Sequence, residues 1–141
     1  MTMKTSPLRV LLVEDNPGDA RLVHEMLSES PWPRFAIMQT QHLEAALDML
    51  RSEPFDAVLL DLLLDDSPRL GTLMEIYEMA PRVPVVVLSG MDDKAVGLWV
   101  LKEGAQDYLV KGKVDAATLV HAICEAIERH DQQVTSGRLM V

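Results

Sequence analysis

Acidic, hydroxyl and basic side chains follow four short apolar runs of this sequence. Glu14 and Asp15 come directly after the first run, and Asp61 comes after the second. Further along, Ser89 ends the third run and Lys111 follows the fourth. Carboxylates that lie close together repel one another and need a cation, and oxygen ligands suit a hard ion such as Mg²⁺. These residue types therefore indicate magnesium-dependent chemistry on an anionic group.

Phosphoryl transfer is the reaction that such a set of residues suits best. A bound Mg²⁺ would polarise an incoming phosphoryl group and neutralise its oxygens. Asp61 could then attack phosphorus and form an acyl phosphate. The ammonium of Lys111 could pair with the phosphoryl oxygens, and the hydroxyl of Ser89 could donate to another. Each residue alone is more often a solvated side chain, so the interpretation requires a fold that brings them together.

The apolar runs are predicted to be strands of a parallel sheet. Leu8–Val13 and Pro84–Leu88 are apolar almost throughout, as expected for strands buried on both faces. Three further strands are predicted at Phe35–Gln39, Ala57–Leu60 and Tyr108–Val110. Strict alternation of strands and helices implies a parallel sheet with helices on both faces. Functional sites of such sheets lie at the carboxyl ends of the strands, where the acids, the serine and the lysine would meet.

Helices are predicted between the strands from the spacing of apolar residues. Asn16 and Pro17 are typical of an N-cap and a first helical residue. The other helices are expected over His42–Arg51, Gly71–Met79, Asp92 to a C′ residue at Gly104, and Asp115 to about His130. Asp131–Val141 has no clear apolar period. We therefore expect one domain over residues 1–130 and a loose tail or linker start over residues 131–141.

The composition is that of a single globular domain with a strong negative charge. The 141 residues are 48% hydrophobic and 25% charged, and the formal net charge is −9. This charge argues against direct binding to nucleic acid. The apolar runs are too short to span a membrane, and Val10–Val13 runs into acids instead of forming a secretory signal. Cys124 is the only cysteine, which fits a reducing compartment. We expect a cytoplasmic protein.

The motifs around these residues resemble those of response-regulator receiver domains of two-component systems. They read LLVEDN at 11–16, VLLD at 58–61, VLSG at 87–90 and GAQDYLVK at 104–111. The resemblance covers about Leu8 to His130. It implies a flavodoxin-like, doubly wound (βα)5 fold whose five-stranded parallel sheet has the order 2-1-3-4-5, an order that chemotaxis receivers exemplify.

The resemblance also implies a role for each residue. Asp61 would be the phosphoacceptor, and Mg²⁺ would be held by Glu14, Asp15, Asp61 and the backbone carbonyl of Leu63. Ser89 and Lys111 would hold the phosphoryl group. The donor would be a phosphohistidine on a sensor histidine kinase or a phosphotransfer protein. Such a chain catalyses only its own aspartyl phosphorylation and dephosphorylation and is not otherwise an enzyme.

The signal would leave through the face made by the fourth helix, the fifth strand and the fifth helix. Tyr108 would be the aromatic switch that turns inward when Asp61 is phosphorylated. A homodimer or a downstream effector would bind this face. The family pattern places Trp99 on the outer side of the fourth helix, where it is a candidate interface anchor. The alternative is that this helix is rotated and Trp99 belongs to the core.

Three positions depart from the usual pattern of the family. Asp65 stands where proline is common, and Arg69 stands where glycine is common, so Gly71 is a candidate for the turn. Gly112 stands where the family usually has a proline joined by a cis bond. A cis bond without proline costs about 2.5–4 kcal/mol, so we predict a trans bond between Lys111 and Gly112.

Other classes of function are less consistent with the sequence. A phosphatase that uses an aspartyl phosphate would place a second acid two residues after the nucleophile, where this chain has Leu63. A flavodoxin-like cofactor binder needs a loop rich in Ser, Thr and Gly after the first strand, and residues 14–17 would repel a phosphate. A degenerate receiver that binds partners without phosphorylation is the remaining alternative.

Overall fold

A computed structural model describes residues 6–62 and 69–139, and over these residues strands and helices alternate as predicted. The strands are β1 (Leu8–Val13), β2 (Phe35–Thr40), β3 (Ala57–Leu60), β4 (Val85–Ser89) and β5 (Asp107–Val110). The helices are α1 (Pro17–Ser28), α2 (Leu43–Ser52), α3 (Arg69–Met79), α4 (Lys94–Lys102) and α5 (Ala116–Leu139). All strand pairs are parallel and the sheet order is β2-β1-β3-β4-β5. The predicted flavodoxin-like doubly wound fold is confirmed.

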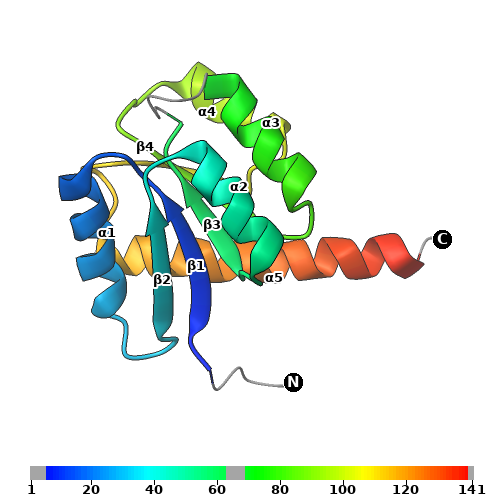
Figure 1. Ribbon diagram of the computed structural model, residues 1–141, viewed down its shortest axis with the longest axis horizontal. Helices are drawn as coiled ribbons and strands as arrows, with labels where there is room; N and C mark the ends of the chain where they lie inside the picture. Colours follow the sequence, from blue (N-terminus) through cyan, green and yellow to red (C-terminus); the bar gives the residue numbers. More distant parts are fainter. Residues whose placement is uncertain (1–5, 63–68, 140–141) are drawn as a thin grey trace.

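Helices cover both faces of the sheet (Figure 1), and each face has its own apolar core. Alternate residues of a strand point to opposite faces. In β1, Leu11 and Val13 accordingly pack with α2, α3 and α4, whereas Val10 and Leu12 pack with α1 and α5. Burial of one such side chain contributes about 1.5–3 kcal/mol. Because both faces are buried, the strands read as continuous apolar runs in the sequence.

Capping residues explain where α1 begins and where α4 begins and ends. The side chain of Asn16 accepts a hydrogen bond from the Asp19 N–H at 2.9 Å, with proline at the first helical position. We predicted that the fourth helix begins at Asp92, but α4 begins at Lys94, because Asp93 is the N-cap and its carboxylate accepts the N–H groups of Ala95 and Val96. Gly104 follows the helix with φ of 114°, as predicted for its C′ residue.

Helix α5 is longer than the sequence pattern indicated. We expected it to end near His130, but it continues to Leu139 and projects past the sheet (Figure 1). Among its described side chains the last buried apolar one is Ala126, and the loss of apolar period beyond it led to the prediction of a loose tail. Adding residues to an existing helix avoids the cost of nucleation, so a segment without an apolar face can continue it. None of the described helices is long and apolar enough to cross a membrane.

Of the three departures from the family pattern, Arg69 and Gly112 are among the described residues. Gly71 does not form the turn that we considered, because α3 already begins at Arg69 and Gly71 is part of that helix. Asp65 lies outside the described residues, so the path of its loop stays a prediction. The bond between Lys111 and Gly112 is trans as predicted, and Gly112 takes the left-handed conformation with φ of 83°.

Candidate functional site

Backbone pairing brings the predicted site residues to one edge of the sheet. The N–H of Asp61 donates to the carbonyl of Val13 at 3.0 Å, which places Asp61 beside the end of β1. The N–H of Lys111 donates to the carbonyl of Ser89 at 2.8 Å, which places Lys111 beside the end of β4. The order β1-β3-β4-β5 of neighbouring strands therefore brings these carboxyl ends together, as the sequence predicted.

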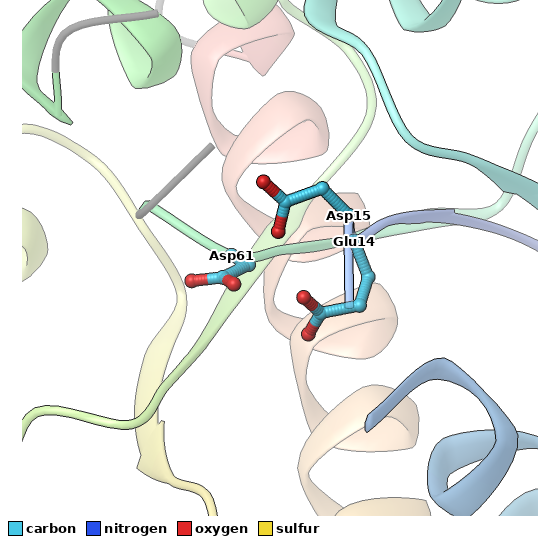
Figure 2. A group of neighbouring side chains, drawn as sticks. All are labelled: Glu14, Asp15 and Asp61. Atoms are coloured by element: carbon cyan, nitrogen blue, oxygen red, sulfur yellow. The ribbon is translucent and has the colours of Figure 1, made fainter. Parts of the chain in front are cut away.

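The carboxylates of Glu14, Asp15 and Asp61 form a compact cluster (Figure 2). One oxygen from each lies within 4.8 Å of the others. Glu14 and Asp61 are only 1% and 5% exposed. A group of buried and half-buried carboxylates has the oxygen chemistry that Mg²⁺ prefers, and a dication would relieve their mutual repulsion. The fourth ligand that we predicted, the carbonyl of Leu63, lies outside the described residues.

Lys111 contacts three carboxylates, one of which the sequence did not suggest. Its Nζ lies 2.5 Å from Glu14 Oε1, 3.0 Å from Asp61 Oδ2 and 2.9 Å from Asp19 Oδ2. Burial lowers the pKa of the ammonium, but the hydrogen bonds to Glu14, Asp19 and Asp61 outweigh it and raise the pKa above the usual value for lysine. Lys111 therefore stays charged and partly neutralises the acids. In the sequence, Asp19 reads only as an acid in the first turn of a helix.

The pKa of Glu14 is raised from 4.5 to about 7. Burial is the largest cause, and the neighbouring carboxylate of Asp61 adds to it. The hydrogen bond from Lys111 lowers the pKa of Glu14 but does not compensate for its burial. The same contact raises the pKa of the Lys111 ammonium. Burial prevails because Glu14 is nearly inaccessible to water. The cluster is thus an environment in which a further cation would be stabilised.

Ser89 and Tyr108 both form hydrogen bonds with the backbone of Met91, in the loop after β4. Ser89 is fully buried, and its Oγ accepts a hydrogen bond from the N–H of Met91 at 3.2 Å. The half-buried Tyr108 donates its hydroxyl proton to the carbonyl of Met91. Its ring lies against Gly97, where a Cβ, if the glycine were alanine, would be 3.0 Å from Cδ1 of the ring. The glycine that weakens α4 therefore makes room for the predicted switch residue.

Trp99 does not lie on the outer side of α4. It is half-buried and packs against the core cluster under α2, α3 and α4, which is the alternative interpretation of its position. The large apolar residues exposed on α4 are Leu98 and Leu101, with exposed fractions of 68% and 42%. An apolar surface therefore exists on this helix, but other residues than Trp99 form it.

A doubly wound sheet with three acids and a lysine at its carboxyl edge defines the receiver type of α/β domain. Residues 10–124 match the family model of the response regulator receiver domain. The chain therefore belongs to the response regulator receiver domain family, as its motifs suggested.

Curated relatives include the cell cycle response regulator CtrA of Brucella abortus and of Brucella ovis. Each is 35% identical over an alignment of 141 positions, which covers 95% of this chain and 58% of the relative. The chain thus spans a little over half the length of these proteins.

Solved structures of similar fold include the phosphorylated cyanobacterial phytochrome response regulator RcpA. It has a TM-score of 0.67 and 25% identity, and the match covers 89% of each chain. A CheY-like receiver domain from Methanospirillum hungatei JF-1 has a TM-score of 0.77 at 20% identity, with 91% of this chain and 99% of that chain covered. The second likeness concerns the fold alone.

Proposed function

We propose that Asp61 accepts a phosphoryl group from the phosphohistidine of a sensor histidine kinase or phosphotransfer protein. Membership of the receiver family implies a partner of this kind in two-component signalling. The observation that carries the proposal is the contact of Lys111 Nζ with Asp61 Oδ2, at 3.0 Å, inside the carboxylate cluster. The phosphorylated form of the relative RcpA supports it.

The chemistry follows from the groups around Asp61. Glu14, Asp15 and Asp61 would hold Mg²⁺, which supplies positive charge for the phosphoryl oxygens. An oxygen of Asp61 forms a bond to phosphorus while the bond from phosphorus to the imidazole nitrogen breaks. The electron pair stays on the imidazole, and the product is an aspartyl phosphate. Lys111 is a compact point charge that pairs with phosphoryl oxygens.

The chain would catalyse only its own phosphorylation and dephosphorylation and would act as a switch in the cytoplasm. The hydroxyl of Ser89, whose Oγ accepts the N–H of Met91, would donate its own proton to the phosphoryl group. Because the carbonyl of Met91 accepts the hydroxyl of Tyr108, a shift of Ser89 toward the phosphoryl group would be transmitted to the Tyr108 ring, which packs against Gly97 of α4. We propose that the face of α4, β5 and α5, with Leu98 exposed on it, then binds a second copy or an effector.

The phosphoacceptor is tested by intact-protein mass measurement after incubation with Mg²⁺ and acetyl phosphate. We expect a gain of one phosphoryl mass that is absent in Asp61→Asn. Asp48→Asn is a matched control, because Asp48 is an exposed acid whose carboxylate contacts Arg51 on α2. If the wild-type protein gains no mass and also fails to bind beryllofluoride, the alternative of a phosphorylation-independent interaction module is favoured.

A further inference from the structure

We propose that Asp19 is a positioning residue that holds Lys111 in the unphosphorylated protein and must release it when Asp61 is modified. The inference deepens the proposed function and rests on it. It assigns a role to a carboxylate outside the cluster of Glu14, Asp15 and Asp61, on a helix instead of a strand end.

The first argument is the number of donors on Lys111. An ammonium has three protons, and each of the three contacts of Nζ is with a different carboxylate, of Glu14, Asp19 and Asp61. A phosphoryl group on Asp61 brings additional acceptor oxygens close to Nζ. Lys111 can donate to one of them only if it gives up an existing partner.

Burial decides which partner is released. The side chain of Glu14 is 1% exposed, so its carboxylate would lose the ammonium at a place that water hardly reaches, and Asp61 is itself the residue that carries the phosphoryl group. The side chain of Asp19 is 41% exposed and can be hydrated after the contact breaks. The pair between Lys111 and Asp19 is therefore the one that costs least to break.

The cap of α1 explains why Asp19 points to Lys111. An acid at the third helical position often accepts the N–H of the N-cap residue. Here the N–H of Asn16 donates to Glu14 Oε2 at 3.2 Å. The N–H of Asp19 is held by the Asn16 side chain, which fixes its backbone, while its carboxylate contacts Lys111.

The structure also has space for Asp19 to move. A cavity of about 390 Å³ lies beside the site and is lined by Asp19, Leu22, Lys111 and Gly112, among others. A carboxylate that turned into this cavity would increase its distance from a phosphoryl group of charge about −1.5 to −2. The contact thus stabilises the unmodified protein more than the phosphorylated one, and Asp19 opposes phosphorylation.

The test is the affinity of the protein for beryllofluoride, a phosphoryl analogue, at saturating Mg²⁺ by isothermal titration calorimetry. A partly exposed ion pair contributes up to about 1 kcal/mol, so Asp19→Asn should bind beryllofluoride roughly 2–5-fold more tightly. Asp19→Glu, which can keep the contact, should return toward the wild-type affinity. Glu25→Gln is the control, because it removes the same charge from α1 at a carboxylate that contacts Arg21.

Thermal unfolding separates this role from a purely structural one. Without beryllofluoride, Asp19→Asn should unfold at a lower temperature than the wild type. With beryllofluoride bound, this difference in unfolding temperature should be smaller or absent. Equal or weaker binding by Asp19→Asn, or an equal gain in Glu25→Gln, would overturn the inference. Asp19→Ser replaces Asp19→Asn if the latter does not fold. A wild-type protein that binds no beryllofluoride would instead contradict the proposed function itself.

Discussion

Lys111 joins acids that come from three different elements of the chain. Glu14 follows β1, Asp61 follows β3 and Asp19 lies in the first turn of α1. The sequence predicted that the first two acids and Lys111 meet at one edge of the sheet, because strand ends of a parallel sheet converge whatever the details of packing. It could not predict the third, since Asp19 and Lys111 are 92 residues apart and their contact depends on how α1 is rotated against the sheet.

At the residue scale, we predict that Glu14 makes the metal-free protein less stable as the pH rises from about 4.5 to about 7. Within this window the folded protein binds a proton at Glu14 that the unfolded chain has lost, so the free energy of unfolding falls. Asp61 and Lys111 face Glu14, and the lysine stays charged throughout this window. Glu14→Gln should lack this component.

Urea unfolding of the wild type and Glu14→Gln at pH 5 and pH 8 measures the effect. The stability of the wild type relative to the variant should decrease at the higher pH. Mg²⁺ should restore the wild type at pH 8, because the ionised carboxylate is the form that binds the cation. A difference between the two proteins that does not change with pH would show that burial does not perturb Glu14.

At the element scale, α4 combines an exposed apolar surface with a glycine in its interior. Glycine in a helix interior is unfavourable relative to alanine, and the reason for Gly97 lies in β5, whose Tyr108 ring occupies the space that a Cβ would need. The sequence suggested Trp99 for the outer surface. Family pattern alone could not fix the rotation of α4, which instead exposes Leu98 and Leu101.

We predict different effects of Gly97→Ala in two backgrounds. In the wild type the new Cβ would be 3.0 Å from Tyr108 Cδ1, so the ring must move and the gain in helix propensity is offset. With Tyr108→Ala the space is open, and Gly97→Ala should stabilise the protein by about 0.5–1 kcal/mol. Denaturant unfolding of the four proteins in this double-mutant cycle gives the coupling. Equal effects in both backgrounds would mean that the contact has no energetic role.

Trp99→Ala and Leu98→Ala should separate stability from association. Trp99 packs against the core, so its truncation should cost roughly 2 kcal/mol, less than the 3–5 kcal/mol of a fully buried tryptophan. Leu98 is largely exposed, so Leu98→Ala should change stability by less than about 0.5 kcal/mol. We expect Leu98→Ala to weaken self-association or effector binding, measured by analytical ultracentrifugation or calorimetry. If only Trp99→Ala weakened association, Trp99 and not Leu98 would be the residue that binds the partner.

At the scale of the whole molecule, the alternation of runs and helices was sufficient to predict the topology. Val85, Val86 and Val87 are each fully buried, and such runs occur where a sheet is covered on both faces. The end of α5 was not predictable in this way, because no apolar face marks its last turns. The helix continues there because the preceding turns are already helical, and this cooperativity is not visible in the pattern of single residues.

We predict that removal of residues 132–141 leaves the domain folded. The last buried apolar residue among the described side chains of α5 is Ala126, so the removed segment begins beyond the helix's main contribution to the core. The thermal midpoint should fall by only a few degrees, as expected for a loss of less than about 1 kcal/mol. A truncated protein that is unfolded, as judged by circular dichroism, would show that the domain extends beyond the limit of residue 130.

Asn16 is bonded on both sides, to the carboxylate of Glu14 through its N–H and to the N–H of Asp19 through its side chain. A change in the charge of Glu14 therefore acts directly on the amide that opens α1. Amide hydrogen exchange in this first turn should respond to Mg²⁺ even though the helix supplies none of the clustered carboxylates. The exchange rates of the amides at the N-terminus of α1, measured by NMR, should therefore report whether the site is occupied.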